Sequence, residues 1–363
     1  MVPPKDFTGY RSPTEVTLEI KPRSRFELID VNERVCEEID DFGQFPKAAY
    51  CSLHTTAGYL EQNLSRRLKD NPESVSSFMG LFHNLFPPEA DYRHDQLHLR
   101  DELSDAQKLV EPRNADSHLT FIGSGLENCV IYKNKPDRPV YFVELDGING
   151  NDARNRRTSV IGFNRETLVE KLTVEIPTSS HPMDSINLRD EKLGFFDQVQ
   201  EIVDYYGIEK GRIDVALKWN EANAGLTVNE YETLLMRHDL VEVLRNPMRY
   251  MARRGYNMLK DPRAIPNKAK NYAKYDLVQI VNEFLDKAGL SESLVERLVD
   301  KMLSVPASRF LRMKRSTRLL ISEDSETGKG RIVQGTYQSP ILVQWRKAER
   351  QARKVEVSFV RFE

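Results

Sequence analysis

Short apolar runs bounded by polar turns predict strands over much of the first 165 residues. Extended segments are expected at 48–53, 119–122, 129–132, 139–145 and 157–163, and a helix is expected over 31–41. In residues 190–206 the apolar side chains fall on one helical stripe, formed by Leu193, Phe196, Val199, Ile202 and Val203. Because strands both precede and follow helical segments, the pattern predicts the α+β class.

Two decapeptides share a frame and indicate an internal repeat. The first runs from His54 to Asn63 (HTTAGYLEQN), and the second runs from Glu221 to Glu230 (EANAGLTVNE). Similar segments open and close each copy: 16–20 matches 172–176, and 139–146 matches 339–346. The repeat predicts two tandem domains, residues 1–165 and 166–363, each a mixed or antiparallel β-sheet sandwich with flanking helices.

The middle parts of the two copies differ in kind. The first copy has polar, histidine-bearing segments at 91–95 and 114–119. The second has helical apolar periodicity at 277–285 and 294–303, with an N-cap expected at Ser291 or Ser293. The sequence therefore predicts that packed helices replace the polar segment in the second copy.

Composition fits a soluble protein of ordinary type. The chain has 363 residues, 39% hydrophobic and 30% charged, which is enough for two cores. The sequence has no apolar run long enough for a membrane span and no apolar signal core near its start, so a cytoplasmic location is expected. The scattered cysteines Cys36, Cys51 and Cys129 are expected to be reduced core residues.

The net charge of −2 conceals a basic excess in the second half, concentrated at 237–274 and 309–318. Such clusters can bind phosphate or nucleic acid. Solvated helix faces are the more common explanation, so no nucleic-acid partner is expected.

Histidines and carboxylates of the first half are candidate metal ligands. His54, His94 and His118, with Asp95, offer the nitrogen and oxygen donors that zinc or a similar divalent ion uses. Asp95 and Asp116 could instead orient the imidazoles. His54 follows an apolar strand and precedes Thr55, where it can act as acid, base or ligand; the alternative is a satisfied core histidine.

Two acids, Glu144 and Asp146, end a predicted strand on one face because side chains alternate along a strand. They could hold a metal or a cationic substrate, or pair with Arg154, Arg156 and Arg157 as a salt-bridged rim. Asn229 and Glu230 stand at the start of an expected helix, where capping is the alternative to a site role.

Four segments of the first half stand in a characteristic order: His54–Gly58 (HTTAG), Tyr92–Asp95 (YRHD), Asn114–His118 (NADSH) and Glu144–Gly147 (ELDG). In this order they resemble the YjbQ-like family of secondary thiamine-phosphate synthases. The family's Asn-Glu pair and its Gln-bearing segment are missing from the first half. They stand in the second half as Asn229-Glu230 and Tyr337-Gln338.

This resemblance implies an enzyme acting on a small phosphorylated substrate, such as a transferase that joins a pyrimidine diphosphate to a thiazole phosphate. It also implies a divalent metal and a homo-oligomer, with trimers of the two-domain chain as one form. The reciprocal losses suggest one composite site between the repeats. Two alternatives stay open: a metal-dependent hydrolase on the same residues, and a non-catalytic binding or regulatory protein.

The expected site is divided by role. Catalytic residues are His54, Thr55, Glu144, Asp146, Asn229 and Glu230. Substrate-binding residues are Thr56, Arg154, Arg156, Arg157 and Gln338. Metal ligands are His54, His94, His118 and Asp95.

Overall fold

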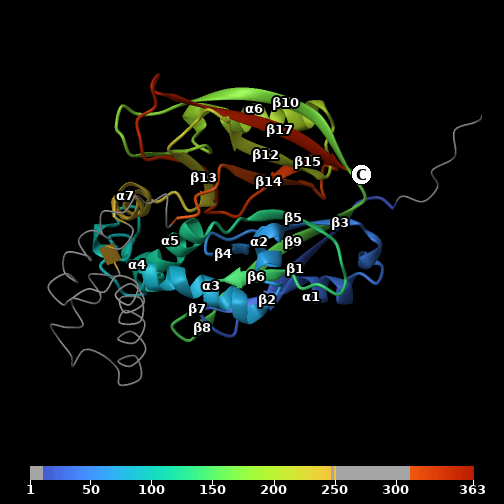
Figure 1. Cartoon of the computed structure of the whole chain (residues 1–363), viewed down its shortest axis with the longest axis horizontal. Coiled ribbons are helices and arrows are strands. Elements are labelled where there is room, and N and C mark those ends of the chain that lie inside the picture. Colours follow the sequence, from blue (N-terminus) through green and yellow to red (C-terminus); the bar gives the residue numbers. More distant parts are fainter. Residues whose placement is uncertain (1–10, 247–248, 251–310) are drawn as a thin grey trace, which may run out of the picture. The chain divides into compact units, whose positions relative to one another are not determined.

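The computed structural model describes residues 11–246, 249–250 and 311–363 (Figure 1). The chain forms two compact units. The sheet unit comprises Met1–Phe78, Phe121–Tyr231 and Met313–Glu363, and the helical unit comprises Met79–Thr120 and Glu232–Arg312. The predicted apolar helices at 277–285 and 294–303 lie outside the described residues.

The first half contributes two main antiparallel sheets to the sheet unit. The larger has the order β1 (Thr14–Ile20), β9 (Arg156–Phe163), β3 (Lys47–Ser52), β5 (Cys129–Lys133). The smaller has the order β2 (Glu27–Asp30), β6 (Tyr141–Glu144), β4 (Ala57–Tyr59), and a short hairpin pairs β7 (Ile148–Asn149) with β8 (Asp152–Ala153). Apolar side chains between the two main sheets, including Tyr50, Tyr59 and Phe142, form a buried core.

The second half builds the same arrangement again. Its larger sheet has the order β10 (Glu166–Pro177), β17 (Ala352–Phe362), β12 (Gly211–Leu217), β14 (Ser316–Glu323), β15 (Gly330–Val333). Its smaller sheet has the order β11 (Asp184–Asn187), β16 (Ser339–Gln344), β13 (Ala224–Asn229). Apart from the added β15, the strand order of each sheet matches that of the first half. The chain is thus a mixed α+β protein with several antiparallel sheets, in agreement with the predicted class.

The larger sheets of the two halves pack on one another. A cluster of buried residues joins them: Ala49, Cys51, Cys129, Ile161 and Phe163 from the first half, with Leu320 and Phe362 from the second. The rings of Phe163 and Phe362 stack with centroids 4.0 Å apart. Burial of this apolar surface stabilises the sheet unit as one body.

The helices of the described residues are short and follow the predicted positions in part. They are α1 (Val31–Glu38), α2 (Gln62–Arg67), α3 (Pro72–Leu85), α4 (Asp105–Val110), α5 (Ala115–Ser124), α6 (Phe195–Tyr205) and α7 (Leu240–Arg245). The strands expected at 48–53, 129–132, 139–145 and 157–163 are confirmed as β3, β5, β6 and β9, and α1 and α6 confirm the two expected helices. No helix of the described residues is long and apolar enough to cross a membrane.

The strand predicted at 119–122 is wrong, because these residues lie within helix α5. The backbone N–H of Ala115, at the start of this helix, donates to Asp95 Oδ1 at 3.0 Å. Asp95 therefore supplies the cap acceptor from a distant segment, which satisfies a donor that the helix itself leaves open. A short apolar run fits either a strand or a buried helix, and its local pattern could not decide between them.

Candidate functional site

The loop that carries His54 follows β3 and is held by hydrogen bonds from both halves. The Gln338 amide donates to the carbonyl oxygens of Ser52 at 3.0 Å and His54 at 2.8 Å. The Asn229 amide donates to Thr55 O at 2.9 Å, and the Asn128 amide donates to His54 O at 2.9 Å. Because both Gln338 and Asn229 are buried, the second half fixes the backbone on which His54 stands.

The His54 ring is neutral, with its proton on Nδ1. Its Nε2 accepts the backbone N–H of Arg157 at 2.7 Å, so Nε2 has no proton of its own. Nδ1 lies 3.5 Å from Arg156 Nη1. Burial, together with the positive charges of Arg156, Arg157 and Arg154, lowers the pKa of His54 to about 3.

The three arginines near His54 differ in what they bind. Arg156 is buried and forms a two-pronged ion pair with Glu144, with Nε 2.6 Å from Oε2 and Nη2 2.8 Å from Oε1. Its Nη2 also donates to Thr56 Oγ1 at 3.0 Å. Arg154 Nη2 donates to Asp146 Oδ2 at 2.5 Å. Both predicted carboxylates are therefore occupied by arginine.

Glu144 and Asp146 were expected on one face of a strand. In the structure they lie in a local turn at the end of the strand. Strand β6 ends at Glu144, and the Asp146 backbone N–H donates back to Glu144 Oε1 at 2.8 Å. Both side chains are buried and pair with arginines, as in the salt-bridged alternative, but inside the sheet unit and not on an exposed rim. Burial raises the pKa of the Glu144 carboxyl, while the Arg156 guanidinium opposes the rise.

The second half contains a counterpart of this arginine cluster, in which the carboxylate stands on a loop and not on a strand. Arg353 Nη1 donates to Glu221 Oε2 at 3.0 Å, and its Nε donates to Gln344 Oε1 at 3.3 Å. The backbone N–H of Lys354 donates to Glu221 Oε1 at 2.9 Å, as that of Arg157 does to His54. Each buried arginine thus has one carboxylate, on the strand in the first half and on the loop in the second.

Two side chains at the His54 loop keep donors available. Arg157 is exposed, and neither its guanidinium nor the Thr55 hydroxyl forms a hydrogen bond or ion pair with another described residue. Together they form a pair of donors in a region of positive charge. Such a set suits an anion.

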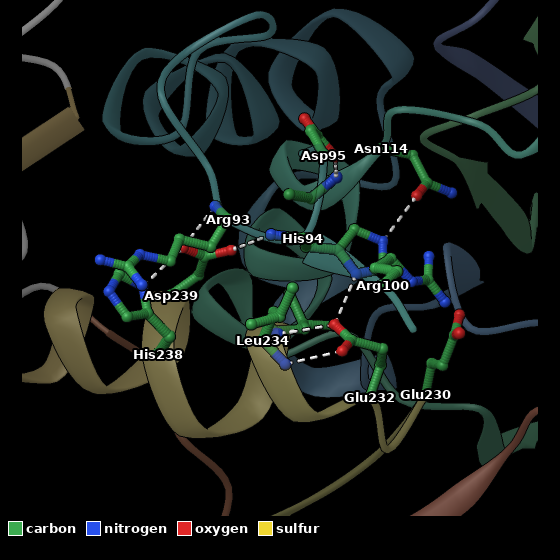
Figure 2. A network of polar contacts seen from close by, with 12 residues as sticks. Arg93, His94, Asp95, Arg100, Asn114, Glu230, Glu232, Leu234, His238 and Asp239 are labelled. Atoms are coloured by element: carbon green, nitrogen blue, oxygen red, sulfur yellow. Dashed lines mark hydrogen bonds and ion pairs between the residues drawn. The ribbon is translucent and has the colours of Figure 1, made fainter. Parts of the chain in front are cut away.

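His94 lies in the helical unit and is buried between two polar partners (Figure 2). Its Nδ1 lies 2.9 Å from Glu232 Oε2, and its Nε2 lies 3.3 Å from Asn114 Oδ1. Burial opposes ionisation of Glu232, but hydrogen bonds from His94 and from the backbone N–H groups of Leu234 and Leu235 hold its pKa below the ordinary range. His94 Nδ1–H therefore donates to a carboxylate.

A second buried acid, Asp239, fixes the backbone around His94 (Figure 2). It accepts the backbone N–H of Arg93 at 3.0 Å and that of His94 at 2.9 Å. The Tyr250 hydroxyl donates to the same carboxylate at 3.0 Å. These bonds join the polar segment of the first half to the helical segment of the second within one unit.

The predicted metal ligands are divided between the two units. His54 belongs to the sheet unit, whereas His94, His118 and Asp95 belong to the helical unit, in which the rings of His94 and His118 meet edge to face at 5.4 Å. Over the described ranges no group of three or more His, Cys, Asp or Glu side chains is arranged to hold a metal ion. The engaged Nε2 of His54 and the surrounding arginines do not fit a cation there.

We expect the free energy of unfolding to decrease as the pH is lowered, because of His54. The histidine pKa is near 6.5 in an unfolded chain and about 3 in the folded one, so between these values only the unfolded state binds the proton. Stability is therefore complete above pH 6.5 and decreases as pH falls toward 3. Urea midpoints between pH 8 and pH 4 should show a smaller decrease in His54→Gln than in the unchanged protein; equal slopes would contradict the assignment.

Sequence reasoning missed several residues that position the site. Asn128 binds the His54 loop, Glu232 and Asp239 bind His94, and Arg353 completes the second cluster. Only Arg353 left a signal, because it stands in the basic segment before the last strand, as Arg156 does. Glu230 follows Asn229, whose Oδ1 accepts its backbone N–H at 2.9 Å.

Comparisons with known proteins give only structural matches. None of the known protein-family models matches the chain, and no curated protein sequence matches it. Among solved structures, a YbjQ-like protein of unknown function from Sulfolobus solfataricus is 17% identical, covering 54% of this chain and 99% of its own with a TM-score of 0.27. A conserved protein of the YjbQ/UPF0047 family from Clostridium acetobutylicum is 18% identical, covering 52% and 98% with a TM-score of 0.24. The chain is thus similar to proteins of this family over about half of its length.

Proposed function

We propose that the chain is an enzyme that binds a small phosphorylated substrate at the His54 loop. The observation that carries the proposal is the neutral His54 among three arginines, with the Thr55 hydroxyl and the Arg157 guanidinium available as donors. Phosphate oxygens accept such donors, and the arginines offset the charge of the anion.

Leaving-group stabilisation is the chemistry that suits these residues. When a diphosphate group leaves an organic substrate, negative charge develops on its bridging oxygen, and fixed positive groups lower the barrier. His54 would hold the Arg157 backbone in place and would not act as a general acid, because a pKa of about 3 leaves little imidazolium to donate a proton at neutral pH. The transferase expected from the resemblance, which joins a pyrimidine diphosphate to a thiazole phosphate, is a reaction of this class.

The site would be composite, built by two copies of one ancestral domain. The matching strand order and the two arginine clusters support a tandem duplication with boundaries at 1–165 and 166–363. In this proposal the first copy supplies His54 and the arginines, and the second supplies Asn229 and Gln338. Glu230 would complete the site. Assembly into a homo-oligomer stays a prediction.

A nucleic-acid partner is less favoured by the charges of the described residues. In the basic segment 309–318, Lys314 and Arg318 pair with Glu127, each at 2.9 or 3.0 Å. Arg315 donates to the carbonyl oxygens of Glu221 and Lys218. These side chains are used in packing the halves together. Most of the other basic segment, 237–274, lies outside the described residues.

The test is release of inorganic diphosphate from an aminopyrimidine diphosphate, with and without a thiazole phosphate. We expect release that requires the second substrate, and a loss of at least about 100-fold in the double variant Asn229→Ala, Glu230→Ala, whose circular dichroism should be unchanged. Release without the second substrate would indicate a hydrolase. Unchanged release by the double variant would rule out the composite site.

A chelator tests whether a metal ion or the arginines provide the positive charge that binds the anion. We expect retained diphosphate binding at the His54 loop in a chelator, together with loss of binding at that loop in Arg157→Ala. Binding that disappears on chelation and returns with zinc would contradict the arginine assignment and support the metal predicted from the sequence.

A further inference from the structure

A second hollow in the sheet unit lies apart in sequence from the His54 loop residues. Its empty space is about 260 Å³ with the adjoining open solvent included. It is lined by side chains from α2, from the turn after it, and from the end of β5 and the following connection. Its floor is formed by Tyr50 and Tyr132, whose rings meet nearly edge on with centroids 5.8 Å apart. Both tyrosines are buried, and their hydroxyls are engaged with Asn32 and with Leu60 O.

The rim of the hollow is strongly basic. Arg66, Lys133, Lys135 and Arg138 line it, against one acid, Asp70. Asp70 accepts the Ser65 hydroxyl at 2.8 Å and lies 3.7 Å from Arg138, which is a loose pair. Within the described parts of the chain, no ion pair involves the other three cations. Unpaired cations around one hollow create a positive potential that attracts anions.

Hydrogen bonds from side chains fix the backbone of this rim before any ligand binds. Asn32, which is 1% exposed, donates to Lys135 O at 3.1 Å and to Arg138 O at 2.9 Å. The Gln62 side chain bonds the backbone of Lys133 in both directions, at 3.2 and 3.3 Å. A rim held in this way loses less conformational entropy on binding, which favours affinity.

We propose that this hollow binds the phosphate or diphosphate group of a small molecule, independently of the His54 loop. The guanidinium groups of Arg66 and Arg138 match the geometry of phosphate oxygens, and the two lysines add point charges.

Titration calorimetry with inorganic diphosphate tests the site, at low salt and in a chelator. We expect two sites in the unchanged protein and one in Lys133→Ala, Lys135→Ala, with affinity for the hollow at least about tenfold lower. The exposed Lys329→Ala, which removes a lysine outside the hollow, should keep both sites. Arg157→Ala should lose the other site and keep the hollow.

Lysine acetylation, measured by mass spectrometry, gives a second test of where diphosphate binds. Diphosphate should protect Lys133 and Lys135, and should leave Lys329 reactive. Equal binding by the lysine double variant and the unchanged protein, without protection, would overturn the hollow and leave the His54 proposal standing. Displacement by a short single-stranded oligonucleotide at lower concentration than diphosphate would overturn the small-molecule ligand in favour of nucleic acid.

Discussion

Replacement of Glu144 by glutamine should destabilise the chain by about 3–5 kcal/mol, because it leaves the buried Arg156 guanidinium without a counter-charge. Glutamine has nearly the shape of glutamate, so the loss reports charge more than packing. The measurement is the free energy of unfolding from urea titration at pH 7.5. As a control, Glu27→Gln removes an ion pair with the exposed Arg23 and should cost less than about 0.5 kcal/mol.

The second half indicates how the loss can be repaired. There the arginine is paired from the loop by Glu221, and the strand position holds Gln344. The double variant His54→Glu, Glu144→Gln moves the carboxylate to the same place in the first half. We expect it to recover about 2 kcal/mol relative to Glu144→Gln alone. A double variant no more stable than the single one would show that the two clusters are not equivalent.

This exchange of charge shows which parts of the site the sequence could predict. The frame of the repeat aligned Glu221 with His54 and Gln344 with Glu144, so the residues that changed were visible before any coordinates. The sequence offered Arg156 as a partner of Glu144 but did not single it out from Arg154 and Arg157. It gave no sign that Arg353 pairs with Glu221, because this contact depends on strand register. The same holds for Asn128, whose amide meets His54 O from a segment 74 residues away.

Helix α5 shows the limit of local pattern in the fold. Thr120 and Ile122 favour a strand by propensity, yet Asp95 caps this segment as a helix. Long periodic segments such as α6 were predictable because their stripe spans several turns. The helical unit combines segments from both halves of the chain, and no periodicity within one segment could indicate such a pairing.

The segment before Gln338 makes the closest approach of the two halves at the site. A Cβ at Gly335 would lie 1.9 Å from the Leu53 carbonyl oxygen, on the backbone just before His54. The Gly335 N–H also donates to Gln338 Oε1 at 2.8 Å, which orients the amide that holds Ser52 and His54. An alanine at position 335 must push the two backbones apart, since the nearest atoms, the carbonyl oxygen and carbon of Leu53, belong to the backbone and not to a flexible side chain.

Gly335→Ala should therefore lower the free energy of unfolding by about 3 kcal/mol and abolish ligand binding at the His54 loop. Gly80→Ala is the matched control: its Cβ would meet no atom within 4 Å in helix α3, so it should stabilise the chain by about 0.5–1 kcal/mol. The measurements are urea unfolding and diphosphate titration. If Gly335→Ala kept its affinity at the His54 loop, Gln338 would have no part in positioning His54, since the contact displaced is the one through which Gln338 acts.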